Sequence, residues 1–225
     1  MTRRTNARVA GFTYLFYIAA GVAGMVLFDG ATGAEGIAGK LARIGEHALD
    51  VRITVLLLLL TCVAALVLAA ALYAITRDED PDLAVLALTC RVGEGVLGAI
   101  ITLATLGLLW LGTAEDGARD ATAAHALGAF LLKVREWSNI IGAALFSVGS
   151  TLFSYLLLRG RMVPVALAWL GVVASVLLVV CLPLQLAGFL GGPIAWLMWL
   201  PMLVFEVVLG LWLLIKGVAM PARGP

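Results

Sequence analysis

The chain has 225 residues, of which 63% are hydrophobic and 13% are charged, and its mean hydropathy is +1.08. A soluble protein has roughly half apolar and a quarter charged residues, so this composition predicts a protein that crosses a membrane several times. The formal net charge of +1 excludes a nucleic-acid partner, because no basic surface is available to displace the counterions of phosphate groups.

The first half of the chain contains three apolar runs long enough to span a bilayer, which takes about 20 residues. They lie at residues 9–28, 52–75 and 83–110. A basic leader precedes the first run, but the run is long enough to span, so we expect an uncleaved helix rather than a removed signal sequence. Residues 37–50 place apolar side chains at helical spacing among charged ones, which predicts an amphipathic interfacial helix.

The second half contains three further apolar runs, at residues 137–158, 165–186 and 194–215. Before them, the Ala-rich residues 113–136 carry an apolar stripe, which predicts a second interfacial helix. The predicted fold is therefore all-α: a single polytopic membrane domain over residues 1–225, with six transmembrane helices and two short interfacial helices.

The basic residues predict the orientation of the chain. With the N-terminus inside, eight Lys and Arg residues flank the spans on the cytoplasmic side and six on the outer side, where they lie in longer loops. We therefore expect a multi-pass protein of the cell's inner (plasma) membrane with both termini in the cytoplasm.

Three charged residues lie deep inside these spans: Arg91 and Glu94 in the third and Glu206 in the sixth. A charged side chain at mid-bilayer costs on the order of 3 kcal/mol, so such residues usually pair or line a cavity. At about 1.5 Å per residue, both acids lie roughly 15–18 Å from one end of their helices. Arg91 and Glu94 share a helix face, and the five donors of Arg91 can serve both acids. We therefore expect the three residues to form one buried cluster.

A short internal similarity surrounds the two acids. The segment Glu94-Gly95-Val96-Leu97-Gly98 of the third span corresponds to Glu206-Val207-Val208-Leu209-Gly210 of the sixth. Three spans per half would make the halves, about residues 1–112 and 113–225, antiparallel. This is the arrangement of inverted repeats in transporters, which place functional groups near the bilayer midplane.

Three roles for the cluster remain open at this point. The charges can simply fix the register of the helices, because buried ion pairs are weak evidence for stability. Glu94 and Glu206 can instead be catalytic, as acids that desolvation drives toward the neutral form. The cluster can also form the polar floor of a lipophilic pocket.

Other polar residues are weaker candidates. His47, Arg52 and Asn139 are expected near the outer mouth, where a solvated interfacial role is the simplest interpretation. The two histidines of the chain lie on different loops, so we expect no metal site. The motifs of zinc proteases, dinucleotide-binding folds, P-loops and nucleophile elbows do not occur, and we expect no cofactor.

Several stretches together resemble a known family. They are residues 8–15, residues 46–52, Arg91-Val92-Gly93-Glu94, residues 142–164, and residues 205–212 followed by Lys216-Gly217. In these stretches, which extend over nearly the whole chain, the sequence resembles the domain-of-unknown-function 4386 family of bacterial multi-pass membrane proteins. The resemblance implies an integral membrane protein with six helices, and it supplies no activity.

Three functions are consistent with these residues. The first is a non-catalytic membrane protein in which Arg91, Glu94 and Glu206 hold the helices together and line a site for a small lipophilic molecule. The second is an intramembrane enzyme, analogous to small terpene cyclases, in which Glu94 or Glu206 is the general acid on an isoprenoid or lipid substrate. The third is a small proton-coupled carrier, which at this length would be a homodimer. The expected partners are membrane lipids and a lipophilic small molecule.

Overall fold

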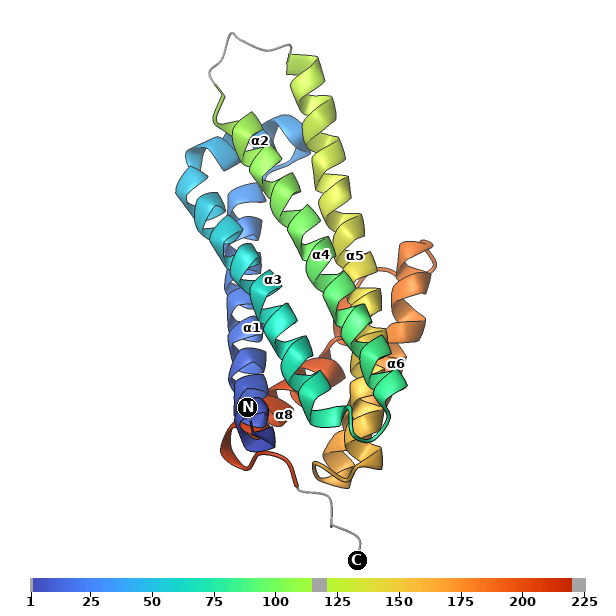
Figure 1. The fold of residues 1–225 in the computed structure, drawn as a ribbon. Coiled ribbons are helices and arrows are strands. Elements are labelled where there is room, and N and C mark those ends of the chain that lie inside the picture. The colour runs from blue at the N-terminus through green and yellow to red at the C-terminus, as the bar shows by residue number, and fades with distance from the viewer. Residues whose placement is uncertain (1, 115–120, 220–225) are drawn as a thin grey trace, which may run out of the picture. The chain divides into compact units, whose positions relative to one another are not determined.

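The computed structural model describes residues 2–114 and 121–219. Within these ranges, six helical segments are long and apolar enough to cross a membrane, which confirms the predicted number (Figure 1). They are α1 (Arg3–Thr32), α3 (Ala48–Thr76), α4 (Pro81–Gly112), α5 (Ala121–Arg159), α6 (Val165–Leu186), and Ile194–Ile215, which consists of α7 (Ile194–Leu197) and α8 (Leu200–Ile215). The predicted amphipathic helix before the second span is α2 (Gly36–Glu46).

Among the residues that the structure describes, the predicted second interfacial helix is not a separate element. Within the described residues, the segment from Ala121 onward is the first part of α5, a continuous helix of 39 residues (Figure 1). Alanine favours helix, and no proline interrupts the chain at the expected junction before Trp137, so the helix propagates into the span. The rest of the predicted segment, residues 115–120, lies outside the described residues. The sixth span is interrupted instead at Met198 and Trp199, and Pro201 lies in the first turn of α8, where a missing N–H costs no helical hydrogen bond.

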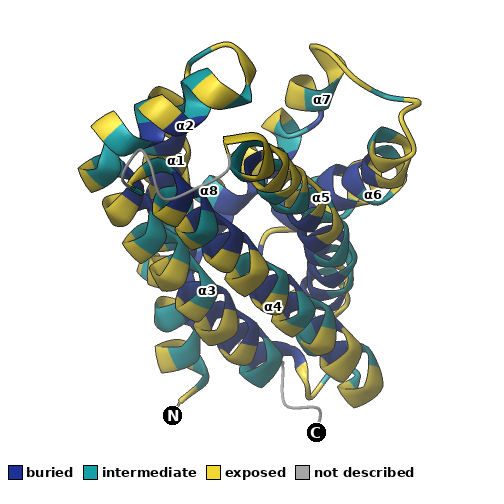
Figure 2. Cartoon of the chain, turned by 90° about the horizontal axis from the view of Figure 1, so that it is seen from above, coloured by how far each residue is buried: buried dark blue, intermediate teal, exposed yellow. Residues whose placement is uncertain are grey.

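Exposed apolar side chains cover the outer faces of the helices. In Figure 2, buried stripes along the helices alternate with exposed ones, and the exposed positions include Leu56 (60%), Leu103 (67%) and Val173 (62%). A face of this kind is unfavourable in water and favourable against acyl chains. The pattern agrees with a multi-pass membrane protein.

The chain divides into two compact units. Unit 1 comprises residues 1–17, 63–95 and 140–225, and its core is built from large buried side chains such as Phe153, Leu178 and Phe205. Close helix approaches support this core. The ring of Phe205 occupies the space that a side chain at Gly171 would fill, and Gly11 of α1 lies against the backbone of α8.

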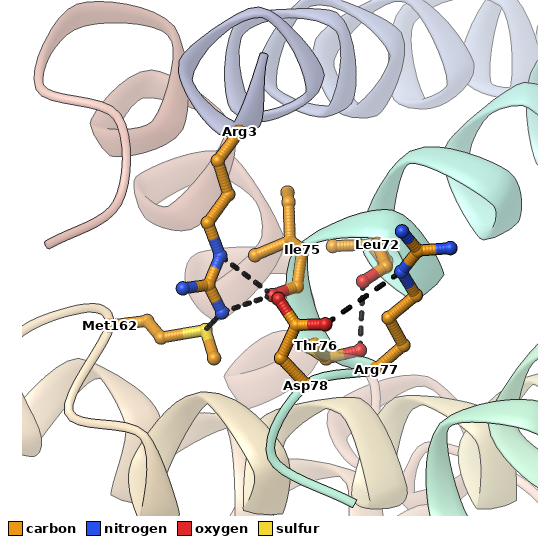
Figure 3. Close-up of polar contacts among 7 residues, drawn as sticks. All are labelled: Arg3, Leu72, Ile75, Thr76, Arg77, Asp78 and Met162. Carbon is orange, nitrogen blue, oxygen red and sulfur yellow. Dashed lines mark hydrogen bonds and ion pairs between the residues drawn. The ribbon is translucent and has the colours of Figure 1, made fainter. Parts of the chain in front are cut away.

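Within unit 1, Arg3 anchors the start of α1 to the end of α3 (Figure 3). Its Nε and Nη2 atoms donate hydrogen bonds of 3.1 and 2.7 Å to the carbonyl oxygen of Ile75. That carbonyl belongs to the last turn of α3, which has no intrahelical donor to satisfy it. A cation at a helix C-terminus is also favoured by the helix dipole.

Unit 2 comprises residues 18–62 and 96–139. Its core contains Phe28, Leu41, Ile44, Val51 and Leu108. Leu41 and Ile44 lie one turn apart on α2, so this helix buries its apolar face against the rest of the unit. The other side of α2 carries the charged residues that made the segment amphipathic in sequence.

Candidate functional site

Helix α4 places Arg91 and Glu94 one turn apart on a buried face. Arg91 is only 1% exposed and Glu94 only 9%. The aliphatic stem of Arg91 lies against α5, where a side chain at Gly149 would come within 3.0–3.2 Å of its Cγ and Cδ atoms. Because Gly149 has no side chain, the buried side chain of Arg91 can pack against α5 at this position.

Both oxygens of Glu94 have a partner. Nη1 of Arg91 lies 3.0 Å from Oε2, and the hydroxyl of Tyr17 donates a 2.7 Å hydrogen bond to Oε1. The sequence predicted the ion pair, because residues three apart on a helix can meet without tertiary help. It did not predict Tyr17, which comes from α1 and was indistinguishable from an ordinary aromatic residue of a span.

Two aromatic rings flank the guanidinium group. Cζ of Arg91 lies 4.7 Å from the ring centroid of Phe146 and 5.9 Å from that of Tyr17. At these distances the negative face of an aromatic ring attracts a cation, and the attraction strengthens where water is excluded. The two rings therefore offset part of the desolvation cost of burying Arg91, and they leave its N–H groups free to donate hydrogen bonds elsewhere.

Glu206 reaches the same region from α8. It is 6% exposed, and the charges of Arg91 and Glu94 are close enough to act on it. No ion pair within 4.0 Å joins it to a cation in the described residues. The two acids thus differ: Glu94 is held at both oxygens, and Glu206 interacts with Arg91 only at longer range.

Several buried polar atoms of unit 1 have no hydrogen-bond partner among the described residues. They are Nε, Nη1 and Nη2 of Arg91, Oε2 of Glu94, Oε1 of Glu206 and Oγ of Ser150. The Arg91–Glu94 contact is short, but its N–H direction is unfavourable, so it acts as an ion pair rather than as a hydrogen bond. A buried polar group without a partner costs about 1–3 kcal/mol, and more when it is charged. The cluster therefore offers unused donors and acceptors in an apolar surrounding.

The predicted outer-mouth residues belong to unit 2. Nδ1 of His47 lies 3.1 Å from Oδ2 of Asp50, with both side chains about 40% exposed. Arg52 and Asn139 are exposed. Within the described residues, no group of three or more His, Cys, Asp or Glu side chains could hold a metal ion.

A second embedded arginine was missed in the sequence. Arg135 of α5 donates a 2.6 Å hydrogen bond to Oγ1 of Thr105, and its Cζ lies 3.6 Å from the ring centroid of Phe28. In the sequence it stood among charged residues of an expected interfacial helix, so nothing distinguished it from a solvated side chain. The arrangement parallels that of Arg91, with an arginine over an aromatic ring.

The comparisons with known proteins identify a family and no activity. No curated protein and no solved structure matches the chain. The family model described as Domain of unknown function (DUF4386) matches residues 9–217, which is nearly the whole chain. The chain therefore belongs to this family.

Proposed function

We propose that this protein binds a small lipophilic molecule through a polar group placed at Arg91, in a bacterial inner membrane with both termini in the cytoplasm. The observation that carries the proposal is the set of buried polar atoms at Arg91 and Glu206 that have no hydrogen-bond partner among the described residues. In a membrane, water is not freely available to satisfy such atoms, and polar groups kept at this depth usually serve a function.

The free atoms define the chemistry of the ligand. Arg91 presents only donors, so it suits an oxygen acceptor such as a carbonyl, carboxyl or hydroxyl group. Oε1 of Glu206 suits a hydroxyl donor. Phe146, an apolar side chain of the unit 1 core, lies against the guanidinium group of Arg91. These features favour a lipid or isoprenoid with an oxygen-containing head and an apolar tail.

Native mass spectrometry of the protein purified from membranes tests this proposal. We expect the wild-type chain to carry a small amphiphile that Arg91→Lys loses, because lysine keeps the charge but not the planar set of five donors. The matched control is Arg135→Lys, which makes the same change over the ring of Phe28 and should keep the molecule. A wild-type chain without any bound molecule, or equal retention by both variants, would contradict the proposal.

A second candidate function is supported by the difference between the two acids. Glu94 is held by Arg91 and Tyr17, whereas Oε1 of Glu206 has no hydrogen-bond partner in the described parts of the chain. Glu206 is therefore the better candidate for a general acid that donates a proton to a bound isoprenoid or lipid. An enzyme of this kind would carry different molecules in the wild type and in Glu206→Gln, since substrate would accumulate in the variant. A simple binding protein would carry the same molecule in both.

A further inference from the structure

An open pocket of about 390 Å³ lies in unit 1 where α5 and α8 end. The turn between α5 and α6 lines it with residues 161–164, and the end of α8 and the chain after it line it with Trp212 and residues 216–219. The backbone N–H of Ala219 donates a 2.9 Å hydrogen bond to the carbonyl oxygen of Met162, which joins the two walls. The volume lies within the range of small-molecule sites.

Of the described residues, two cations and no acid line this pocket. Arg161 and Lys216 are exposed, and neither forms an ion pair within 4.0 Å in the part of the chain that the structure describes. The neighbouring cation Arg159 differs, because its Nη1 lies 3.1 Å from Oδ2 of Asp80. The positive charge of the pocket is therefore available to an anion from outside the chain.

The backbone at Arg161 is unusual for its residue type. The N–H of Met162 bonds to the carbonyl of Leu157, and the N–H of Arg161 bonds to that of Leu158. These two bonds form the Schellman motif, which places Arg161 at the position where glycine is preferred. Its φ is +47°, and it is the one residue other than glycine with positive φ in the described chain. The end of α8 has Gly217 (φ +74°) in a left-handed conformation instead.

Helix dipoles do not account for the choice of arginine. Cations near the C-termini of α5 and α8 are favourable, and Arg159 and Lys216 already occupy those positions. Glycine would adopt this left-handed conformation at position 161 with less strain. The presence of arginine there therefore indicates that its side chain has a function that offsets the backbone strain.

We propose that this pocket binds the phosphate headgroup of an anionic phospholipid of the surrounding membrane. Both cations follow the ends of membrane-spanning helices, which is the depth at which headgroups lie, and basic pockets between such helices bind anionic lipids. Trp212 adds an aromatic residue of the type enriched at this depth. The exposed side chains of Val165 and Ile215, on the adjoining helix ends, offer apolar surface to the acyl chains.

Lipid binding to the delipidated full chain tests the proposal. Native mass spectrometry would compare dioleoyl phosphatidylglycerol with dioleoylglycerol, which has the same acyl chains and no phosphate. We expect retention of phosphatidylglycerol alone. Loss of either charge, in Arg161→Gly or Lys216→Gln, should weaken its binding about tenfold, as expected when a charge-assisted contact is lost. Arg159→Gln removes a cation beside the pocket that is already paired with Asp80, and it should bind as the wild type does.

The variants also separate binding from folding. Arg161→Gly should keep the melting temperature of the wild type or raise it, because glycine prefers this backbone conformation, and Arg161→Lys should restore lipid binding. Equal retention of both lipids, equal weakening by Arg159→Gln, or full displacement of phosphatidylglycerol by inorganic phosphate would overturn the proposal. The last result would identify a site for free anions.

Discussion

The hydroxyl of Tyr17 donates a 2.7 Å hydrogen bond to Oε1 of Glu94, and so connects α1 to α4 inside the buried part of unit 1. Arg91 lies 3.0 Å from the other oxygen of the same carboxylate. The acid is thus the central member of a row that runs from a tyrosine to an arginine. Such a row fixes one arrangement of two helices, because any rotation would leave a charged group in an apolar surrounding without a partner.

Replacing Tyr17 by phenylalanine removes the donor and keeps the ring beside Arg91. One oxygen of Glu94 then becomes a buried acceptor without a partner, which should lower the free energy of unfolding by about 1–3 kcal/mol. Thermal unfolding in detergent measures the effect. The matched control is Tyr155→Phe on α5, where the side chain is 43% exposed and no change is expected. Equal melting temperatures for Tyr17→Phe and the wild type would show that the hydrogen bond contributes nothing to stability.

Removing one partner of the buried ion pair should lower the free energy of unfolding more than removing both. Glu94→Gln leaves Arg91 charged and buried without its anion, and a loss of about 3–5 kcal/mol is expected for such a change. The double variant Arg91→Met/Glu94→Gln removes both partners of this ion pair and should give more folded protein than Glu94→Gln alone. Size-exclusion chromatography of the detergent-solubilised variants measures the folded fraction. If the double variant gave a smaller folded fraction than Glu94→Gln, Arg91 would have to stabilise the fold without Glu94.

The sequence predicted the features that depend on local pattern. Six spans follow from apolar length, and the Arg91–Glu94 pair follows from spacing on one helix. The partner Tyr17 depends on which face of α1 meets α4, and no periodicity in one sequence contains that information. The continuation of α5 was missed for another reason: an amphipathic segment has the same pattern whether it lies on a membrane or extends a span. A turn after the fourth span is expected from the sequence, but the left-handed backbone at Arg161 gave no signal, because glycine stands one position earlier, at Gly160.

Removing the side chain of Arg3 should loosen the end of α3. Arg3→Ala deletes two hydrogen bonds to the carbonyl of Ile75, and charged donors of this kind are worth roughly 1.5–3 kcal/mol. Hydrogen exchange of the last turn of α3 should become faster. Arg4→Ala is the control, since Arg4 is the exposed neighbour and its loss removes the same charge. Equal exchange rates in the two variants would mean that net charge at the terminus, rather than the contact with Ile75, holds this end of the helix.

Two glycines of α1 should respond in opposite ways to the same added methyl group. A Cβ atom at Gly11 would lie 2.5 Å from the carbonyl oxygen of Gly210 and 2.5 Å from the amide nitrogen of Leu214. Because these are backbone atoms of α8, they cannot move aside as a flexible side chain can, so Gly11→Ala should force the helices apart and cost roughly 1–3 kcal/mol. No described atom lies within 4 Å of the same atom at Gly21, so Gly21→Ala should be neutral, or stabilising by up to about 1 kcal/mol through its helix propensity. Melting temperatures in detergent compare the two variants directly. A destabilised Gly21→Ala beside an unaffected Gly11→Ala would contradict the close crossing of α1 and α8 within unit 1.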